Sequence, residues 1–121
     1  MEVLNGYKDL LVWKKGMLLA KEIYRLSCLL PKQETFGLVS QLRRAAVSVP
    51  SNIAEGYGRE TTQEYLRFLR IARGSDYEVD TQLWLCVSLG YFTKADAEQA
   101  FSLCDEIARM LYSMIKKISP A

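Results

Sequence analysis

Residues 97–115, AEQAFSLCDEIARMLYSMI, decide the fold. Apolar side chains recur there in alternating steps of four and three residues, at Ala97, Phe101, Cys104, Ala108, Leu111 and Ile115. A repeat of about 3.5 residues is typical of a helix that packs along one side against other helices. Thr93, with Asp96 three residues later, is suited to cap its first turn. We therefore expect a helix over residues 94–118.

Three more segments have apolar residues at helical spacing, and residues that start or stop helices mark their ends. These segments are residues 10–30, 36–56 and 61–89. Pro31 is expected to end the first, because the residue before a proline is pushed out of the helical region. Thr61 and Glu64 open the third with a capping box. Gly74 interrupts the third, and close packing of another helix is the preferred explanation over a hinge.

Pro50 lies inside the second segment. Its ring removes the hydrogen bond to the carbonyl of Ala46 and crowds it, so we expect a kink or a short break near this point. Four helices joined by short connections favour an antiparallel up-down-up-down arrangement. The sequence thus predicts an all-α fold, a four-helix bundle with its second helix kinked near Pro50, as a single domain over residues 1–121.

Composition excludes several classes of protein. The 121 residues include no histidine, which excludes Ser-His-Asp and Cys-His catalysis and the histidine-containing metal sites. No stretch approaches the roughly 18 apolar residues of a membrane span. Three widely spaced cysteines, Cys28, Cys86 and Cys104, indicate buried thiols in a reducing compartment. We expect a cytoplasmic protein that is not an enzyme and uses no cofactor or metal.

The charge is unevenly distributed. Residues 1–73 carry a net charge of +5 and residues 74–121 a net charge of −3, for a total of +2. Every basic residue between positions 36 and 73 is an arginine, at Arg43, Arg44, Arg59, Arg67, Arg70 and Arg73. Guanidinium groups bind phosphate bidentately, which favours a phosphate-binding face. Surface ion pairs such as Glu55 with Arg59 and Glu64 with Arg67 are the alternative.

The sequence predicts structural roles, rather than binding roles, for its clustered acidic residues and its tryptophans. Asp76, Glu78 and Asp80 cluster in the third segment, and we expect a solvated face or an arginine partner there. Trp13 and Trp84 are expected in the core or an interface, rather than stacked on bases. The first helix has apolar residues on more of its circumference than one bundle seam requires, which predicts self-association.

Residues 36–59, FGLVSQLRRAAVSVPSNIAEGYGR, closely resemble the four-helix-bundle family named after the intervening sequences inserted in bacterial 23S ribosomal RNA. The resemblance extends over nearly the whole chain, through Tyr7-Lys8-Asp9-Leu10, Val12-Trp13, and Glu64, Arg67, Phe68, Leu69, Ala72, Arg73, Gly74 and Ser75. The family is similar to the accessory variability proteins of diversity-generating retroelements, which are basic pentameric bundles that associate with a reverse transcriptase and nucleic acid. The resemblance implies a bacterial protein that assembles into a ring, a pentamer, and binds RNA without enzymatic activity.

Two groups of residues are candidates for function. The nucleic-acid-binding candidates are Arg43, Arg59, Arg67 and Arg70. A structural polar network beside Pro50 is the rival use of the motif, because helical steps of four, three and four place its members on one face, at Arg44, Ser48, Ser51 and Glu55. The leading hypothesis is an oligomeric adaptor associated with RNA or another nucleic acid. The alternative is a scaffold that binds a protein partner through the same surface.

Overall fold

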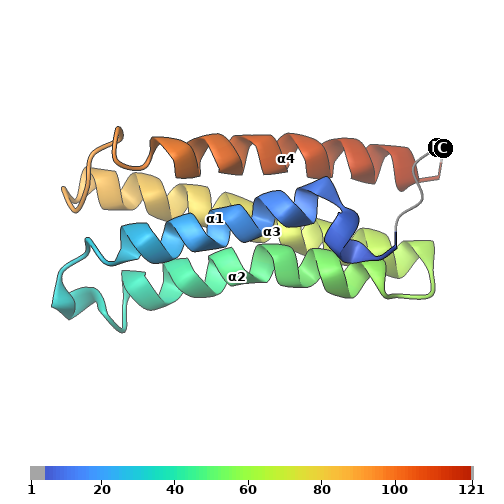
Figure 1. Cartoon of the computed structure of the whole chain (residues 1–121), viewed down its shortest axis with the longest axis horizontal. Helices are drawn as coiled ribbons and strands as arrows, with labels where there is room; N and C mark the ends of the chain where they lie inside the picture. Colours follow the sequence, from blue (N-terminus) through green and yellow to red (C-terminus); the bar gives the residue numbers. More distant parts are fainter. Residues whose placement is uncertain (1–4, 121) are drawn as a thin grey trace.

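The computed structural model describes residues 5–120, which form four antiparallel helices in one bundle (Figure 1). The helices are α1 (Leu11–Ser27), α2 (Leu38–Tyr57), α3 (Thr62–Ser88) and α4 (Glu98–Ile118). Two short 3-10 helices, η1 (Tyr7–Asp9) and η2 (Lys32–Glu34), precede α1 and α2. No strand occurs within the described range, so the predicted all-α bundle is confirmed. The predicted domain, 1–121, also includes residues 1–4 and 121, which lie outside the described residues.

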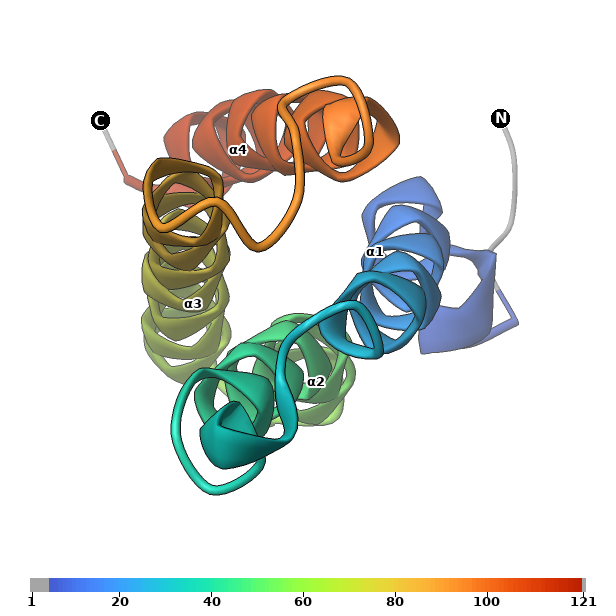
Figure 2. The same ribbon diagram turned by 90° about the vertical axis from the view of Figure 1, so that its left-hand side faces the viewer.

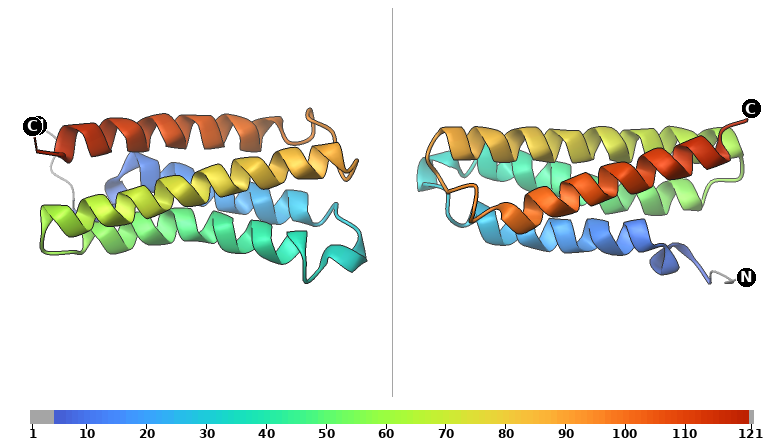
Figure 3. Two further views of the ribbon diagram at one scale, coloured as in Figure 1. Left: turned by 180° about the vertical axis from the view of Figure 1, so that it is seen from behind. Right: turned by 90° about the horizontal axis from the view of Figure 1, so that it is seen from above.

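Each helix contacts its two neighbours around the bundle. Seen end-on (Figure 2), α1, α2, α3 and α4 follow one another around the core, and the views from behind and above agree (Figure 3). The most extensive interface lies between α2 and α3. Each helix contributes fully buried aliphatic side chains, among them Leu19, Ile23, Leu42, Ile53, Leu69, Leu83, Ile107 and Leu111. No helix in the described part of the chain is long and apolar enough to cross a membrane.

Pro50 lies inside α2 without interrupting it. The helix is continuous on both sides of the proline, so the predicted short break does not occur. The ring is buried against Gly16 of α1, where an added Cβ atom would lie 3.3 Å from the Cβ atom of Pro50. Asn52 Nδ2 donates to the carbonyl oxygen of Ser48 at 2.8 Å. α2 therefore continues through Pro50 although a proline cannot donate the hydrogen bond to the carbonyl four residues earlier.

A short turn over residues 58–61 connects α2 to α3. The hydroxyl oxygen of Thr61 accepts from the amide of Glu64 at 3.1 Å, as the capping box predicts. The Glu64 carboxylate turns toward Arg67, so only half of the box forms. α2 and α3 approach closely at Gly56: an added Cβ atom there would lie only 2.7 Å from the Cβ atom of Phe68. Glycine is required at this position for close packing.

Gly74 lies on the outer face of α3. It is exposed, and an added Cβ atom would meet no other atom within 4 Å. The prediction that another helix packs over Gly74 within the chain is therefore wrong. The stripe of core residues on α3 passes along the opposite face of the helix, through Ala72 and Val79.

The ends of α1 and α4 differ from the predicted positions by three or four residues. α1 ends at Ser27, because the backbone tightens into turns before Pro31. α4 begins at Glu98 although the predicted cap forms, with Thr93 and Asp96 each accepting from the amide of the other, at 3.0 and 2.9 Å. This reciprocal pair closes a turn ahead of the helix. The cap residues thus predict the position of the turn correctly, but they predict the first residue of the helix less accurately.

Candidate nucleic-acid interface

Arg43 is held against α1 by its whole side chain. Its Nε atom donates to Ser27 Oγ at 2.9 Å, and an Nη atom lies 3.8 Å from Cys28 Sγ. The guanidinium stacks on Tyr24, 4.5 Å from the ring centroid. These contacts join the first turns of α2 to the end of α1. Arg43 is therefore half-buried in a structural contact, apart from the other three candidate arginines.

The structure does not join the residues of the predicted polar network, which are Arg44, Ser48, Ser51 and Glu55. No hydrogen bond links them to one another among the described residues. Ser48 Oγ instead shares a 2.9 Å hydrogen bond with Ser75 Oγ of α3, and Asn52 Nδ2 donates to Ser48 Oγ at 2.8 Å. The network that forms runs across the α2–α3 interface rather than along α2. Arg44 is exposed, so it is Arg43, not Arg44, that makes the structural contact.

Arg59 and Arg67 meet over one aromatic ring at the α2–α3 turn. Their guanidinium groups lie 4.7 and 4.5 Å from the centroid of Phe68. Each also pairs with a carboxylate on its own helical segment, Arg59 with Glu55 at 3.5 Å and Arg67 with Glu64 at 2.9 Å. These are the surface ion pairs that the sequence predicted as the alternative to a phosphate-binding face. The Arg67 hydrogen bond lowers the pKa of the Glu64 carboxyl, so the pair is ionised at neutral pH.

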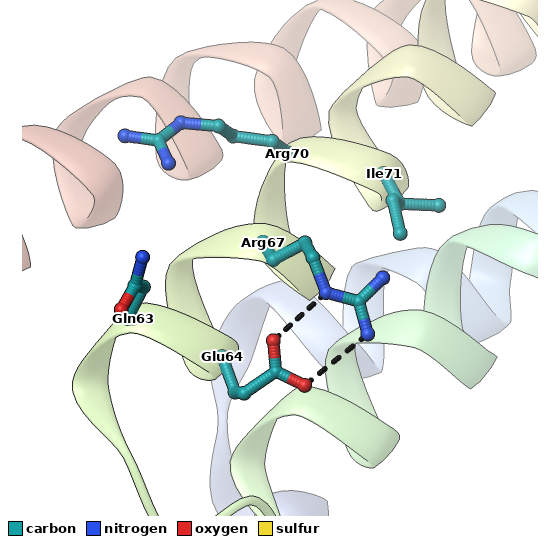
Figure 4. Close-up of a pocket in the computed structure, with 5 residues that line it drawn as sticks. All are labelled: Gln63, Glu64, Arg67, Arg70 and Ile71. Atoms are coloured by element: carbon teal, nitrogen blue, oxygen red, sulfur yellow. Dashed lines mark hydrogen bonds and ion pairs between the residues drawn. The ribbon is translucent and has the colours of Figure 1, made fainter.

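Arg70 lies one turn further along α3, beside a shallow hollow of about 510 Å³ that Arg67, Gln63, Glu64 and Ile71 also line (Figure 4). Its guanidinium points away from the Arg67–Glu64 pair. Within the described residues it makes no ion pair or side-chain hydrogen bond. We call Arg59, Arg67 and Arg70 the arginine patch. All three are exposed, on neighbouring turns of the chain at one end of the bundle.

An apolar groove follows the outer seam between α1 and α2. It has a volume of about 360 Å³ and is lined chiefly by Tyr7, Trp13, Met17, Val47, Pro50 and Ser51. Met17 and Val47 are exposed although apolar. Four of the lining residues, Val47, Pro50, Ser51 and Ala54, belong to the motif at residues 36–59. The motif therefore builds an outward surface as well as part of the core.

Asp76 corrects the prediction of a solvated acidic face. Its side chain is buried, with 1% of the residue exposed, and neither carboxylate oxygen has a hydrogen-bond partner in the described structure. The sequence held a signal for this, because position 76 continues the core stripe between Ala72 and Val79 in steps of four and three. Asp80 is half-buried and Glu78 is exposed.

The cysteines and tryptophans follow the predictions in part. Cys86 and Cys104 are buried, but Cys28 is exposed at the end of α1. Burial raises the pKa of Cys86 to about 11, so this thiol stays protonated. Trp13 is half-buried, with its ring edge-on to Tyr7 at 5.4 Å. Trp84 remains 45% exposed between Phe101 and the ammonium group of Lys94.

The fold and these surfaces define a four-helix-bundle protein whose outward features are an arginine patch and apolar seams. Comparison with known proteins identifies the family: residues 8–113 match the 23S rRNA-intervening sequence protein family, and the chain belongs to it. The resemblance found in the sequence is thereby confirmed. No curated protein matches the chain.

A similar solved structure supports the fold. The chain is similar to a protein of unknown function from the S23 ribosomal protein family of Bacteroides thetaiotaomicron, with a TM-score of 0.81 and 27% sequence identity. The match covers 88% of this chain and 99% of the other. The bundle thus extends over almost the entire length of that relative.

Proposed function

We propose that this protein is a non-enzymatic cytoplasmic adaptor that assembles into a homo-oligomer and binds RNA or another nucleic acid through the arginine patch. The observation that carries the proposal is the grouping of Arg59, Arg67 and Arg70 as exposed side chains beside one turn. Guanidinium forks bind phosphate oxygens through parallel hydrogen bonds. The side chain of Arg43 is bound to residues of α1, so Arg43 is not part of the proposed interface.

The ion pairs of the patch do not oppose phosphate binding. Exposed pairs contribute little to stability because water and salt screen them. A phosphate group can therefore replace Glu55 or Glu64 as the partner of its arginine at small cost. The last turn of α4, with Lys116 and Lys117, lies at the same end of the bundle as the α2–α3 turn (Figure 1) and adds positive charge there.

Self-assembly explains how a modest patch would gain affinity. The α1–α2 groove and the exposed apolar residues of α1, Leu11, Met17, Leu18 and Tyr24, offer an area for a second copy. This area and the arginine patch lie on different parts of the surface, so both can be occupied together. Repeating the patch around an oligomer raises the overall affinity by multivalency. The resemblance implies five copies.

The test is filter binding of single-stranded RNA to single Arg→Gln variants at two salt concentrations. Loss of Arg59, Arg67 or Arg70 should weaken binding by a similar factor for unrelated sequences, and each lost contact should reduce the log-log salt slope by about 0.7. Arg109→Gln is the matched control, because Arg109 is also an exposed arginine in an ion pair, with Asp105 on α4 at 2.7 Å. Its loss should change RNA binding least.

A protein-partner scaffold is the second candidate, and a second apolar groove favours it. This groove lies between α1 and α4, has a volume of about 410 Å³ and is lined by residues including Leu10, Leu11, Met110 and Met114. Absence of RNA binding at about 50 mM salt would remove the nucleic-acid proposal and leave the scaffold. A mass of 13.8 kDa by light scattering at micromolar concentration would remove self-assembly from either version.

A further inference from the structure

The interface between α3 and α4 contains a carboxylate with no protein partner. Asp76 is 1% exposed, and both of its Oδ atoms lack a hydrogen-bond partner among the described residues. Burying a carboxylate normally requires a cation, a set of hydrogen-bond donors or protonation, because loss of hydration is costly. The thiol of Cys104 is the adjacent group on α4, and it is a weak donor.

A small cavity opens beside Asp76, and none of the described residues that line it is basic. The cavity has a volume of about 120 Å³ and is lined by Asp76, Tyr77, Asp80, Cys104, Asp105 and Ala108. Asp80 is half-buried and Asp105 is exposed, so the three carboxylates lead from the core to the surface. Arg109 pairs with Asp105 at 2.7 Å but does not line the cavity. We call this cavity the acidic pocket.

Two of the three pocket carboxylates, Asp76 and Asp80, have no ion-pair partner among the described residues. Burial is the main cause that raises the pKa of Asp76 to about 7; the Cys104 thiol opposes this rise, and the charges of Asp80 and Asp105 add to it. Burial and Asp105 raise the pKa of Asp80 as well. A cation in the pocket would relieve both effects. The C-terminal part of the chain that forms it carries a net charge of −3, against +5 for the rest.

The geometry selects one kind of cation. Within the described residues, no three His, Cys, Asp or Glu side chains are positioned to hold a metal ion together. An organic cation places no such demand, because its several N–H donors reach separate carboxylates. The volume equals that of about four water molecules at roughly 30 Å³ each, which accommodates an ammonium or guanidinium group with part of its stem.

We propose that the acidic pocket between α3 and α4 binds an ammonium or guanidinium group, with Asp76 accepting hydrogen bonds at its inner end and Asp80 and Asp105 at its mouth. The group comes either from a free amine or from a lysine or arginine of a second copy of this chain. The binding chemistry is the same in both cases. The site does not depend on nucleic-acid binding, because the arginine patch lies elsewhere on the bundle.

The first experiment titrates the full chain with methylguanidinium chloride and follows the carboxyl carbon of Asp76 by NMR. We expect saturable binding that lowers the pKa of Asp76 by at least one unit. Tetramethylammonium chloride at equal ionic strength is the control, because it screens charge without donating hydrogen bonds. An identical response to both salts would overturn the proposal.

Variants of the pocket carboxylates test where methylguanidinium binds. Asp76→Asn should abolish saturable binding of methylguanidinium while the helical circular dichroism persists, and Asp80→Asn should weaken it at least several-fold. Glu60→Gln is the control, because Glu60 is exposed in the α2–α3 turn, and its affinity should equal that of the wild type. Asp80→Asn keeps the test valid if Asp76→Asn does not fold. Equal affinity in the wild type and in the folded Asp variants would refute the site.

Sedimentation equilibrium identifies the source of the group. If an arginine or lysine of a second copy fills the pocket, Asp76→Asn should weaken self-association at least tenfold, and methylguanidinium should dissociate the wild-type oligomer. If the occupant is a free amine, self-association should be unchanged while methylguanidinium still binds. Failure of methylguanidinium to affect either the Asp76 carbon or self-association would overturn the proposal for both sources.

Discussion

The polar residues at the α2–α3 interface have hydrogen-bond partners, whereas the buried carboxylate at the α3–α4 interface does not. Between α2 and α3, Ser48 and Ser75 face each other at 2.9 Å, and Asn52 completes the set. Between α3 and α4, the one donor beside Asp76 among the described residues is the weak Cys104 thiol, and neither carboxylate oxygen has a partner with good hydrogen-bond geometry. Satisfied polar pairs fix how two helices fit together, whereas an unsatisfied carboxylate destabilises the contact that surrounds it. Within one bundle, α3 therefore has a polar contact that is complete on one side and incomplete on the other.

Replacement of Asp76 should produce the largest effect. Its pKa is raised from an ordinary value of 3.8 to about 7 in the folded protein. The folded state thus binds the proton more tightly, so this group's contribution to stability is present below pH 4 and lost as the pH rises through 7. Each pKa unit corresponds to about 1.4 kcal/mol, which predicts a loss of roughly 4 kcal/mol.

Urea unfolding of the wild type and Asp76→Asn from pH 4 to pH 8 checks this prediction. The variant should gain stability relative to the wild type across the range and be the more stable protein at pH 8. Glu98→Gln, at an exposed position at the start of α4, should follow the wild-type profile. Parallel curves for the wild type and Asp76→Asn would show that the carboxylate is satisfied after all.

Two glycines of neighbouring helices should respond in opposite directions to the same change. Alanine normally stabilises a helix by about 1 kcal/mol over glycine. At Gly56 the new Cβ atom meets the Cβ atom of Phe68 at 2.7 Å, and relief of this contact should cost about 1–3 kcal/mol. Gly56→Ala should therefore lower the melting temperature and Gly74→Ala should raise it. A stabilised Gly56→Ala would contradict the close approach of α2 and α3.

Loss of the satisfied polar contact should have a smaller effect. Ser48→Ala removes the partner of Ser75 and one partner of Asn52, which should cost about 1 kcal/mol. A double-mutant cycle with Ser75→Ala measures the contact itself. We expect the double variant to be less destabilised than the sum of the single variants. Strict additivity would mean that the two hydroxyl groups do not interact.

The smallest effect is expected in the arginine patch. Arg67→Gln removes an exposed pair with Glu64, and exposed pairs contribute little to folding. Its melting temperature should equal that of the wild type within error by differential scanning calorimetry. Arg43→Gln is the comparison, because it removes contacts to Ser27 and Tyr24 and should melt lower. Equal melting of the two variants would contradict their different roles.

Sequence patterns predicted the helices well because apolar spacing reports directly which face of a helix is buried. They predicted the ion pairs of Arg59 and Arg67 because both partners lie on the same helical turns. They misplaced Arg43 and Arg44, because the partners of Arg43 are Ser27 and Tyr24 on another helix. Knowing which residues share a face of α2 does not reveal which neighbouring helix that face contacts.

Asp76 was missed for a different reason. Its position in the core stripe of α3 was visible, but a charged residue is almost never fully buried without a partner. The general expectation thus outweighed the periodicity. Gly74 shows the same difficulty, since glycine in a helix usually marks close packing and here lies in open space. In both cases the presence or absence of a neighbouring helix, which the residue type does not reveal, determines the outcome.

The order of the helices around the bundle also determines how the chain is expected to fold. α2 and α3 are joined by the short turn over residues 58–61 and share the largest interface, whereas α1 and α4 are neighbours in space but far apart in the sequence. Contacts between sequence neighbours form quickly, which favours folding within microseconds to milliseconds. We expect the α2–α3 hairpin to form first and its amide protons to exchange most slowly with solvent, while the α1–α4 seam opens earliest in partial unfolding.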